Sequence, residues 1–130
     1  MTEIFSRKCW NKTNYWLEEG KQYRFTTQGT WKDGSLDDCD SFGWTKTGNS
    51  YKDRLIKIFE HFRRMPSANW FSMIGAIEKN KKTFIDIGAM VKNNQVYTAT
   101  ATGYLWCFAN DLSIAYINNK GSIFLKIEDL

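Results

Sequence analysis

Two pairs of oxygen-bearing side chains near the C-terminal end of the sequence have a spacing that suits cation binding. Asn110 and Asp111 follow one strand-like run, Asn118 and Asn119 precede another, and six residues separate the pairs. Carboxylate and amide oxygens on a loop that bends back on itself are typical ligands of hard cations such as Ca2+. The same residue types are common in turns, where they hydrogen bond to nearby backbone, so a loop-ordering role is the alternative.

The segments that must position this loop have the alternating pattern of β-strands. In the segment 121–128, Ile123, Leu125 and Ile127 fall on the face opposite Lys126. The same pattern predicts strands at 22–28, 70–78, 83–87, 95–101 and 103–110, and a short strand within the irregular residues 1–16. Many short strands separated by polar turns favour an all-β, antiparallel sandwich or barrel.

One segment, residues 50–65, has a helical pattern instead. Its apolar residues lie at positions i, i+3, i+4 and i+7: Leu55, Ile58, Phe59 and Phe62. Pro66 marks the predicted end, because the residue before a proline is pushed out of the helical region. We expect an inserted amphipathic helix that caps one end of the sandwich, with its apolar stripe on the core and its charged face in water.

The same helix has a basic surface that suggests a different role. Between residues 51 and 64 it carries five basic and two acidic side chains, with Arg63 and Arg64 at its end. A protein partner, or less favourably a nucleic acid, could bind this surface. The charge of the whole chain, +4 with a pI near 9.0, is compatible with an anionic partner but does not require one.

Length and hydropathy favour one domain, residues 1–130, with no membrane-spanning segment. The chain has 130 residues and 15.2 kDa, and no apolar run is long enough to cross a bilayer. The first residues lack the apolar core of a signal peptide. We therefore expect a cytosolic protein, one exported without a cleaved signal, or a mature form.

The reactive residue types give no catalytic pattern. His61, the only histidine, has no nucleophile motif beside it, so we expect no enzyme activity. Cys9, Cys39 and Cys107 have no metal-type spacing, and free thiols are favoured over a Cys39–Cys107 disulfide.

A second group of carboxylates precedes the predicted helix. Asp33, Asp37, Asp38 and Asp40 crowd one loop. Carboxylates that hydrolyse a glycoside must flank a cleft from rigid elements, so we interpret these as turn residues.

Four motifs, taken in order, give the chain a family resemblance over residues 17–128. They are GKQYRFTTQGTW at 20–31, CDSFGW at 39–44, ANWFSMIGAI at 68–77, and the closing segment 103–127 with its Asn110-Asp111 and Asn118-Asn119-Lys120-Gly121-Ser122. Together they resemble the PA-I type galactose-binding lectins, within the galactose-binding-like β-sandwich domains. The resemblance implies a jelly-roll-like β-sandwich and a non-catalytic, carbohydrate-binding function.

The resemblance also implies a site. In these lectins the closing loop binds one Ca2+, and the ion binds sugar hydroxyls directly. By resemblance the metal ligands are Asp111, Asn118 and Asn119, with backbone carbonyls from Ala115 and from Gly34. The residues expected to bind the sugar are Asp33, Asn110, Asp111, Leu112 and Asn118.

The resemblance ends at the residues that would choose the sugar. The family has a sugar-contacting aromatic near the position of Gly34, and residues 45–65 have no counterpart, so galactose is only the family's usual ligand. Trp31, Trp44 or Trp106 could stack on a sugar or fill the core. Lectins of this size often gain avidity by forming homo-oligomers. The alternative is a protein-interaction module on the same fold that works through the helix.

Overall fold

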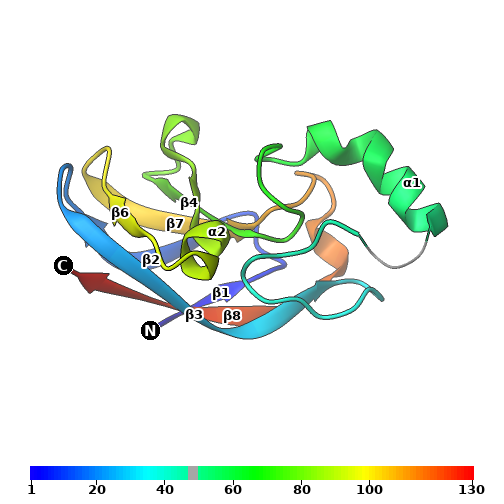
Figure 1. Cartoon of the computed structure of the whole chain (residues 1–130), viewed down its shortest axis with the longest axis horizontal. Coiled ribbons are helices and arrows are strands. Elements are labelled where there is room, and N and C mark those ends of the chain that lie inside the picture. Colours follow the sequence, from blue (N-terminus) through cyan, green and yellow to red (C-terminus); the bar gives the residue numbers. More distant parts are fainter. Residues whose placement is uncertain (47–49) are drawn as a thin grey trace.

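Eight strands form two four-stranded antiparallel sheets that pack face to face, in a computed structural model that describes residues 1–46 and 50–130 (Figure 1). One sheet has the order β1-β8-β3-β6 and the other β2-β7-β4-β5. The strands are β1 (Thr2–Phe5), β2 (Asn11–Leu17), β3 (Gln22–Asp33), β4 (Met73–Ile77), β5 (Ile85–Asp86), β6 (Val96–Thr98), β7 (Gly103–Ala109) and β8 (Asn119–Asp129). The predicted all-β antiparallel sandwich is confirmed.

The longest pairing in the molecule joins β3 to β8. Its register runs from Tyr23 opposite Asp129 to Asp33 opposite Asn119. This register places the end of β3 beside the start of β8, where two of the predicted site residues lie. Gly121 has a φ of +90° on this ladder, and an added Cβ would lie 3.1 Å from the Cα of Trp31. Only glycine therefore fits this bend without strain.

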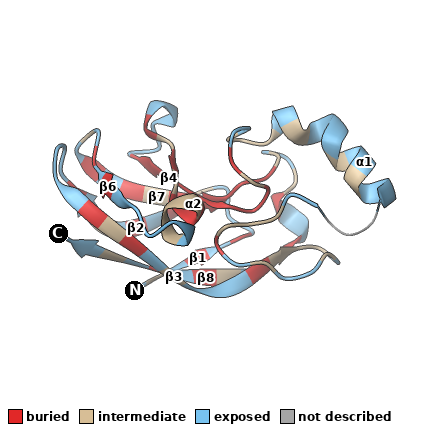
Figure 2. Cartoon of the chain, in the orientation of Figure 1, coloured by how far each residue is buried: buried red, intermediate tan, exposed pale blue. Residues whose placement is uncertain are grey.

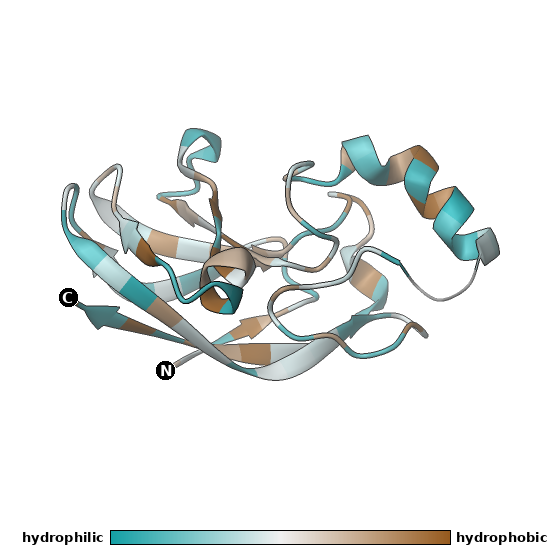
Figure 3. Cartoon of the chain, viewed as in Figure 1, coloured by the Kyte–Doolittle hydropathy of each residue, from teal (hydrophilic) through white to brown (hydrophobic). Residues whose placement is uncertain are grey.

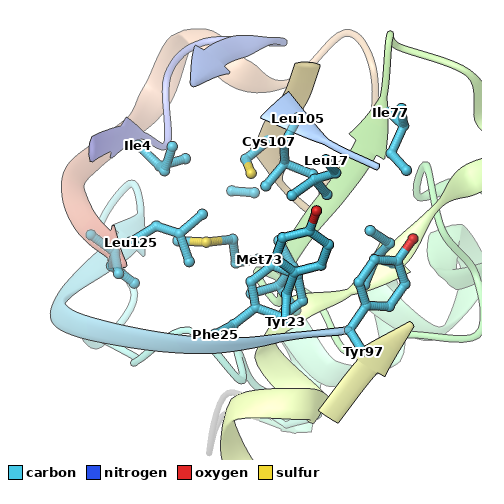
Figure 4. Packing of buried hydrophobic residues seen from close by; sticks show 14 of the residues in the cluster. Ile4, Leu17, Tyr23, Phe25, Met73, Ile77, Tyr97, Leu105, Cys107 and Leu125 are labelled. Atoms are coloured by element: carbon cyan, nitrogen blue, oxygen red, sulfur yellow. The ribbon is translucent and has the colours of Figure 1, made fainter. Parts of the chain in front are cut away.

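Side chains from the inner faces of both sheets fill the core. The strand alternation predicted from sequence is visible in β8, where Ile123 and Leu125 are fully buried and Phe124 is exposed. Figure 4 shows these apolar side chains meeting between the sheets, with Leu105 from β7 and Phe25 from β3 on opposite sides. Burial of this apolar surface is the main favourable term in folding.

A second, smaller apolar cluster lies on the outer face of the β2-β7-β4-β5 sheet. Its buried members are Ala68, Ile74 and Phe108. Trp10 and Phe84 pack against them from the side and remain half-buried. We call this set the outer cluster. It attaches the loop that follows the helices to the back of the sandwich.

Residues 81–92 differ from the prediction. The predicted strand at 83–87 is reduced to the two-residue β5, preceded by the short 3-10 helix η2 (Lys81–Thr83) and followed by helix α2 (Ile87–Lys92). Ile85 and Ile87 alternate as in a strand, and both are buried. However, the side chain of Asp86 accepts a hydrogen bond from the backbone N–H of Ala89 at 3.0 Å and so starts a helix. The lead-in at 1–16 also holds two strands, β1 and β2, rather than one.

Helix α1 (Ser50–Phe59) exists as predicted and continues into the 3-10 helix η1 (Glu60–Phe62), but its apolar stripe is not buried. Ile58 is 62% exposed and Phe62 is 70% exposed. The half-buried residues of α1 are Asp53 and Ile56, so the helix is rotated relative to the predicted face. Figures 2 and 3 show α1 as a largely exposed helix of mixed hydropathy at one end of the sandwich. The expectation that this stripe packs on the core was wrong.

Two further sequence expectations bear on the fold. All three cysteines are free, with Cys107 buried in the core and Cys39 half-buried. Among the described residues, no helix is both long and apolar enough to span a membrane.

Candidate functional site

The loop that joins β7 to β8 is fixed at its first residue by Asn110, which is fully buried. Its side-chain oxygen accepts from the backbone N–H of Met65 at 2.9 Å, and its amide nitrogen donates to the carbonyls of Met65, Ala68 and Asn69. These bonds engage both ends of the amide in holding the 65–69 turn. A ligand contact from Asn110 therefore stays a prediction, and the bonds in the structure give it a positioning role.

Asp111 follows directly and is buried, with 2% of its surface exposed. One carboxylate oxygen, Oδ1, accepts from the backbone N–H of Leu112 at 2.7 Å. Burial raises the pKa of Asp111 to about 6, although the bonds from Leu112 and Asn119 oppose this rise, while the nearby charge of Asp33 adds to it. A carboxylate in this position gains from any cation placed beside it.

Asn119 is fully buried at the other end of the loop, and its oxygen lacks a partner. Its amide nitrogen donates to the carbonyl of Ser6 at 2.9 Å and to Oδ2 of Asp111 at 3.1 Å. Its Oδ1 has no hydrogen-bond donor within the described part of the chain. A buried acceptor without a donor costs roughly 1–3 kcal/mol, so this oxygen is suited to a ligand that the protein itself does not supply.

The end of β3 adds further oxygen atoms to the same place. Asp33 is opposite Asn119 in the sheet, and its side chain hydrogen bonds to that of Asn118. Burial raises the pKa of Asp33, while Asn118 and the charge of Lys52 act in the opposite direction. The backbone N–H of Gly34 donates to the carbonyl of Asn118 at 3.0 Å. Asp33, Gly34 and Asn118 are therefore brought together with Asp111 and Asn119, as predicted.

This donor set fits a hard cation whose ligands are mainly neutral oxygens. Across residues 1–46 and 50–130, no group of three or more His, Cys, Asp or Glu side chains is placed to bind a metal. The carboxylates of Asp111 and Asp33 are joined instead by the amide oxygens of Asn118 and Asn119. Ca2+ accepts such mixtures of carboxylate, amide and backbone oxygens. Ala115, the predicted carbonyl donor, is half-buried directly before the 3-10 helix η3 (Tyr116–Asn118).

Two residues that the sequence analysis did not connect with the site hold this loop against the outer cluster. The Tyr116 hydroxyl donates to the carbonyl of Ala109 at 2.6 Å and accepts from Arg64 at 2.9 Å. The Arg64 guanidinium lies 3.4 Å from the centre of the Phe108 ring, and its backbone N–H donates to the carbonyl of Asp111 at 3.1 Å. Tyr116, the only aromatic residue inside the polar loop, was the available sequence signal.

A pocket of about 250 Å³ opens beside these oxygens, between the sandwich and helix α1. Loop and strand-end residues form one wall, and helix residues form the other. The lining residues are Asp33, Gly34, Ser35, Leu36, Asn118, Lys52, Leu55 and Ile56. The segment without a counterpart in the family resemblance thus supplies one side of the space where a ligand on the loop would lie. Leu112, a predicted ligand contact, is half-buried and forms a β-bridge with Arg63.

The three tryptophans considered as sugar platforms have different positions. Trp31 is buried in the core, where its indole N–H donates to the carbonyl of Phe71 at 2.9 Å, so it fills the core. Trp44 stacks on Trp70 with ring centres 5.8 Å apart. Trp106 lies half-buried on the outer sheet face, away from the core.

The acidic loop before α1 contains ordinary turn chemistry. The carboxylate of Asp40 accepts from the backbone N–H of Phe42 at 2.9 Å, which closes a turn around its own backbone. Asp37 and Asp38 are exposed beside it. His61 lies exposed on η1, away from these carboxylates.

Comparison with known proteins identifies the fold and not the ligand. No protein-family model matches the sequence, and no curated protein matches it. The fold is similar to a solved structure described as "EclA N-terminal domain; PllA-like lectin", with a TM-score of 0.66 and 13% sequence identity over 99% of this chain and 94% of that one. At this identity the likeness concerns the fold, so the narrower PA-I assignment stays a prediction. The chain has the β-sandwich fold of a lectin domain.

Proposed function

We propose that the protein is a non-catalytic carbohydrate-binding protein that holds its glycan over the 110–119 loop through Ca2+. The unpaired, buried Oδ1 of Asn119 beside the buried carboxylate of Asp111 carries this proposal. An uncompensated acceptor and a desolvated carboxylate are both costly unless a cation joins them. Their place at the tip of a lectin-type sandwich supports the same interpretation.

The residues that would hold the ion come from both ends of the loop and from the end of β3. Asp111 would supply the carboxylate, Asn118 and Asn119 amide oxygens, and Ala115 and Gly34 backbone carbonyls. When bound, Ca2+ supplies open coordination positions that vicinal hydroxyls of a sugar can fill. The chain's own contribution is rigidity, because Asn110, Tyr116 and the carbonyl of Ser6 fix the loop before any ligand arrives.

The pocket beside the loop is where the sugar would be selected. Leu55 and Ile56 offer apolar surface to its ring, and Lys52 places a cation near Asp33. A positive side chain at this wall favours hydroxyl-rich or acidic sugars over cationic ones. Galactosides are the first ligands to test, on the basis of the family resemblance.

A glycan array with Ca2+ and then with EDTA tests this function, using the wild-type protein, Asp111→Asn and the control Asp129→Asn. Asp129 is exposed at the far end of β8 from the loop. We expect binding that is lost with EDTA and in Asp111→Asn and is kept in Asp129→Asn. No glycan binding under either condition would exclude the lectin function, and binding that survives EDTA would exclude the metal.

The exposed stripe of α1 supports a second candidate, a protein-interaction role. Ile58, Phe59 and Phe62 form an apolar surface that the described part of the sandwich leaves open to solvent. If this surface joins two copies of the chain, light scattering should show a dimer that Ile58→Glu with Phe62→Glu converts to a monomer. A wild-type monomer at high concentration would contradict self-association through α1.

A further inference from the structure

A groove of about 480 Å³ runs across the outer cluster, separate from the pocket beside the loop. Basic and aromatic side chains line it, and none of its lining residues is acidic. The chief lining residues are Trp10, Phe84, Arg63, Arg64, Lys79 and Lys81. We propose that this groove, here called the basic groove, binds the acidic groups of an anionic oligosaccharide.

The cations of the basic groove have no carboxylate to neutralise them. Lys79 and Lys81 are exposed, and no salt bridge among the described residues includes either of them or Arg63 or Arg64. Arg63 donates instead to the backbone carbonyls of Glu60, Pro66 and Ala68, so its charge is fixed in place. Four like charges that converge on one concave surface create a potential that attracts anions.

Aromatic rings form the floor between these charges. The rings of Trp10 and Phe108 meet edge to face at 5.1 Å, and Phe84 contacts both. Trp10 and Phe84 are half-buried, which leaves part of each ring for a ligand. Apolar ring surface beside fixed cations suits a sugar whose C–H face is apolar and whose substituents are charged.

The floor continues along β7 as a row of alternating rings and lysines. Tyr104 and Trp106 occupy the same outer face as Phe108, and the strand advances about 13 Å between Tyr104 and Phe108. The Lys79 ammonium lies 4.2 Å from the Trp106 ring centre, and that of Lys12 lies 4.6 Å from the ring centre of Tyr104. The surface is therefore longer than a single sugar ring.

The choice of a glycan rather than a nucleic acid rests on the proposed function. Ser113, in the middle of the 110–119 loop, also lines the basic groove, so one oligosaccharide could extend from the loop into the groove. In addition, lysine ammonium groups lie over the rings of Trp106 and Tyr104, where bases would have to stack.

Calorimetric titration of the full chain with a heparin hexasaccharide tests the basic groove. The test variant is Lys79→Glu with Lys81→Glu, and the matched control is Lys82→Glu with Lys126→Glu. Lys82 adjoins Lys81 in η2 but does not line the basic groove, and Lys126 lies exposed on β8. We expect the test variant to weaken binding by about tenfold or more and the control to stay within about twofold of wild type.

Three further arms separate this proposal from others. The de-sulfated hexasaccharide should bind more weakly, and binding of the hexasaccharide should persist in EDTA and in Asp111→Asn. Failure of the proposed function would appear only as the absence of EDTA-sensitive binding to neutral glycans. Equal loss in both charge-reversal variants, equal affinity for the de-sulfated form, or loss in EDTA would overturn the basic groove. Tighter, Lys79- and Lys81-dependent binding of single-stranded DNA would assign the groove to nucleic acid instead.

Discussion

The amide nitrogen of Asn119 donates to the carboxylate of Asp111 at 3.1 Å, while the oxygen of the same amide faces no donor in the described part of the chain. Both side chains are buried, and they come from opposite ends of one loop. The pair therefore keeps an acceptor and a carboxylate together, away from water, without protein groups that neutralise them. Asn119 and Asp111 are placed for a cation.

This pair predicts how the stability of the metal-free protein depends on pH. The pKa of Asp111 is raised from 3.8 to about 6, so the folded state holds a proton that the unfolded state has lost between these values. Stability is then greatest below about pH 4, falls as pH rises to about 6 and is level above, a loss of roughly 3 kcal/mol. Asp33, whose pKa is also raised, contributes with the same sign. Urea unfolding in EDTA from pH 4 to 7 measures it, and Asp111→Asn should flatten the curve.

The same raised pKa predicts a pH-dependent effect of calcium. A proton on Asp111 competes with the ion, so Ca2+ should raise the melting temperature more at pH 7.5 than at pH 5. Calorimetric scans with and without Ca2+ at the two values compare the shifts. An equal shift at both pH values, or none at pH 7.5, would contradict a role of Asp111 as a metal ligand.

Tyr116→Phe should weaken calcium binding although the hydroxyl is a loop anchor and not a ligand. The change removes the bonds to Ala109 and Arg64 that hold the loop, at a cost of about 1–3 kcal/mol. Tyr23→Phe is the matched control, because this buried tyrosine loses a bond from the N–H of Glu18 far along β3. Isothermal titration with Ca2+ should show reduced affinity only in Tyr116→Phe. Equal affinities in the two variants would mean that the anchor does not shape the site.

Arg64→Lys should destabilise the protein by roughly 2 kcal/mol despite keeping the charge. The guanidinium stacks on Phe108 and donates to both the carbonyl of Cys9 and the Tyr116 hydroxyl, and an ammonium cannot reproduce this planar set of contacts. Urea unfolding measures the loss, with Arg54→Lys on the exposed surface of α1 as control. If Arg64→Lys unfolds like wild type, the stack does not hold the loop.

Gly88→Ala tests a close approach that the sequence does not reveal. A Cβ on Gly88 would overlap the carbonyl oxygen of Ser41 and the hydroxyl of Ser72, so the loop before α1 and helix α2 would have to move apart. We expect a loss of about 3 kcal/mol or more. Gly20→Ala meets no neighbour and changes only a residue at φ +86°, which should cost about 1 kcal/mol. Thermal unfolding of the two variants separates overlap from backbone strain.

The sequence predicted most strands because a sheet with one buried face imposes a period of two on residues such as Ile123 and Leu125. It failed at Ile85 and Ile87, where the same alternation spans a strand end and a helix start. It also failed on α1, because periodicity identifies an apolar face but not whether anything covers it. Ile58 and Phe62 show this most clearly.

The candidate site divides in the same way. Asp111 and Asn119 lie in one loop, so local composition was enough to connect them. The carbonyl of Ser6 and the side chain of Arg64 reach the loop from far along the chain, through β1–β8 pairing and the outer cluster. Contacts of this kind depend on the completed fold and have no local pattern.

The long β3–β8 ladder also has a kinetic consequence. Asp33 and Asn119 are the last pair of a register that continues without interruption to Tyr23 and Asp129. Opening the base of the loop therefore requires strands that are buried in the core to separate. The backbone amides near Asn119 should exchange with deuterated solvent as slowly as those of the central core strands, even though they border a binding loop.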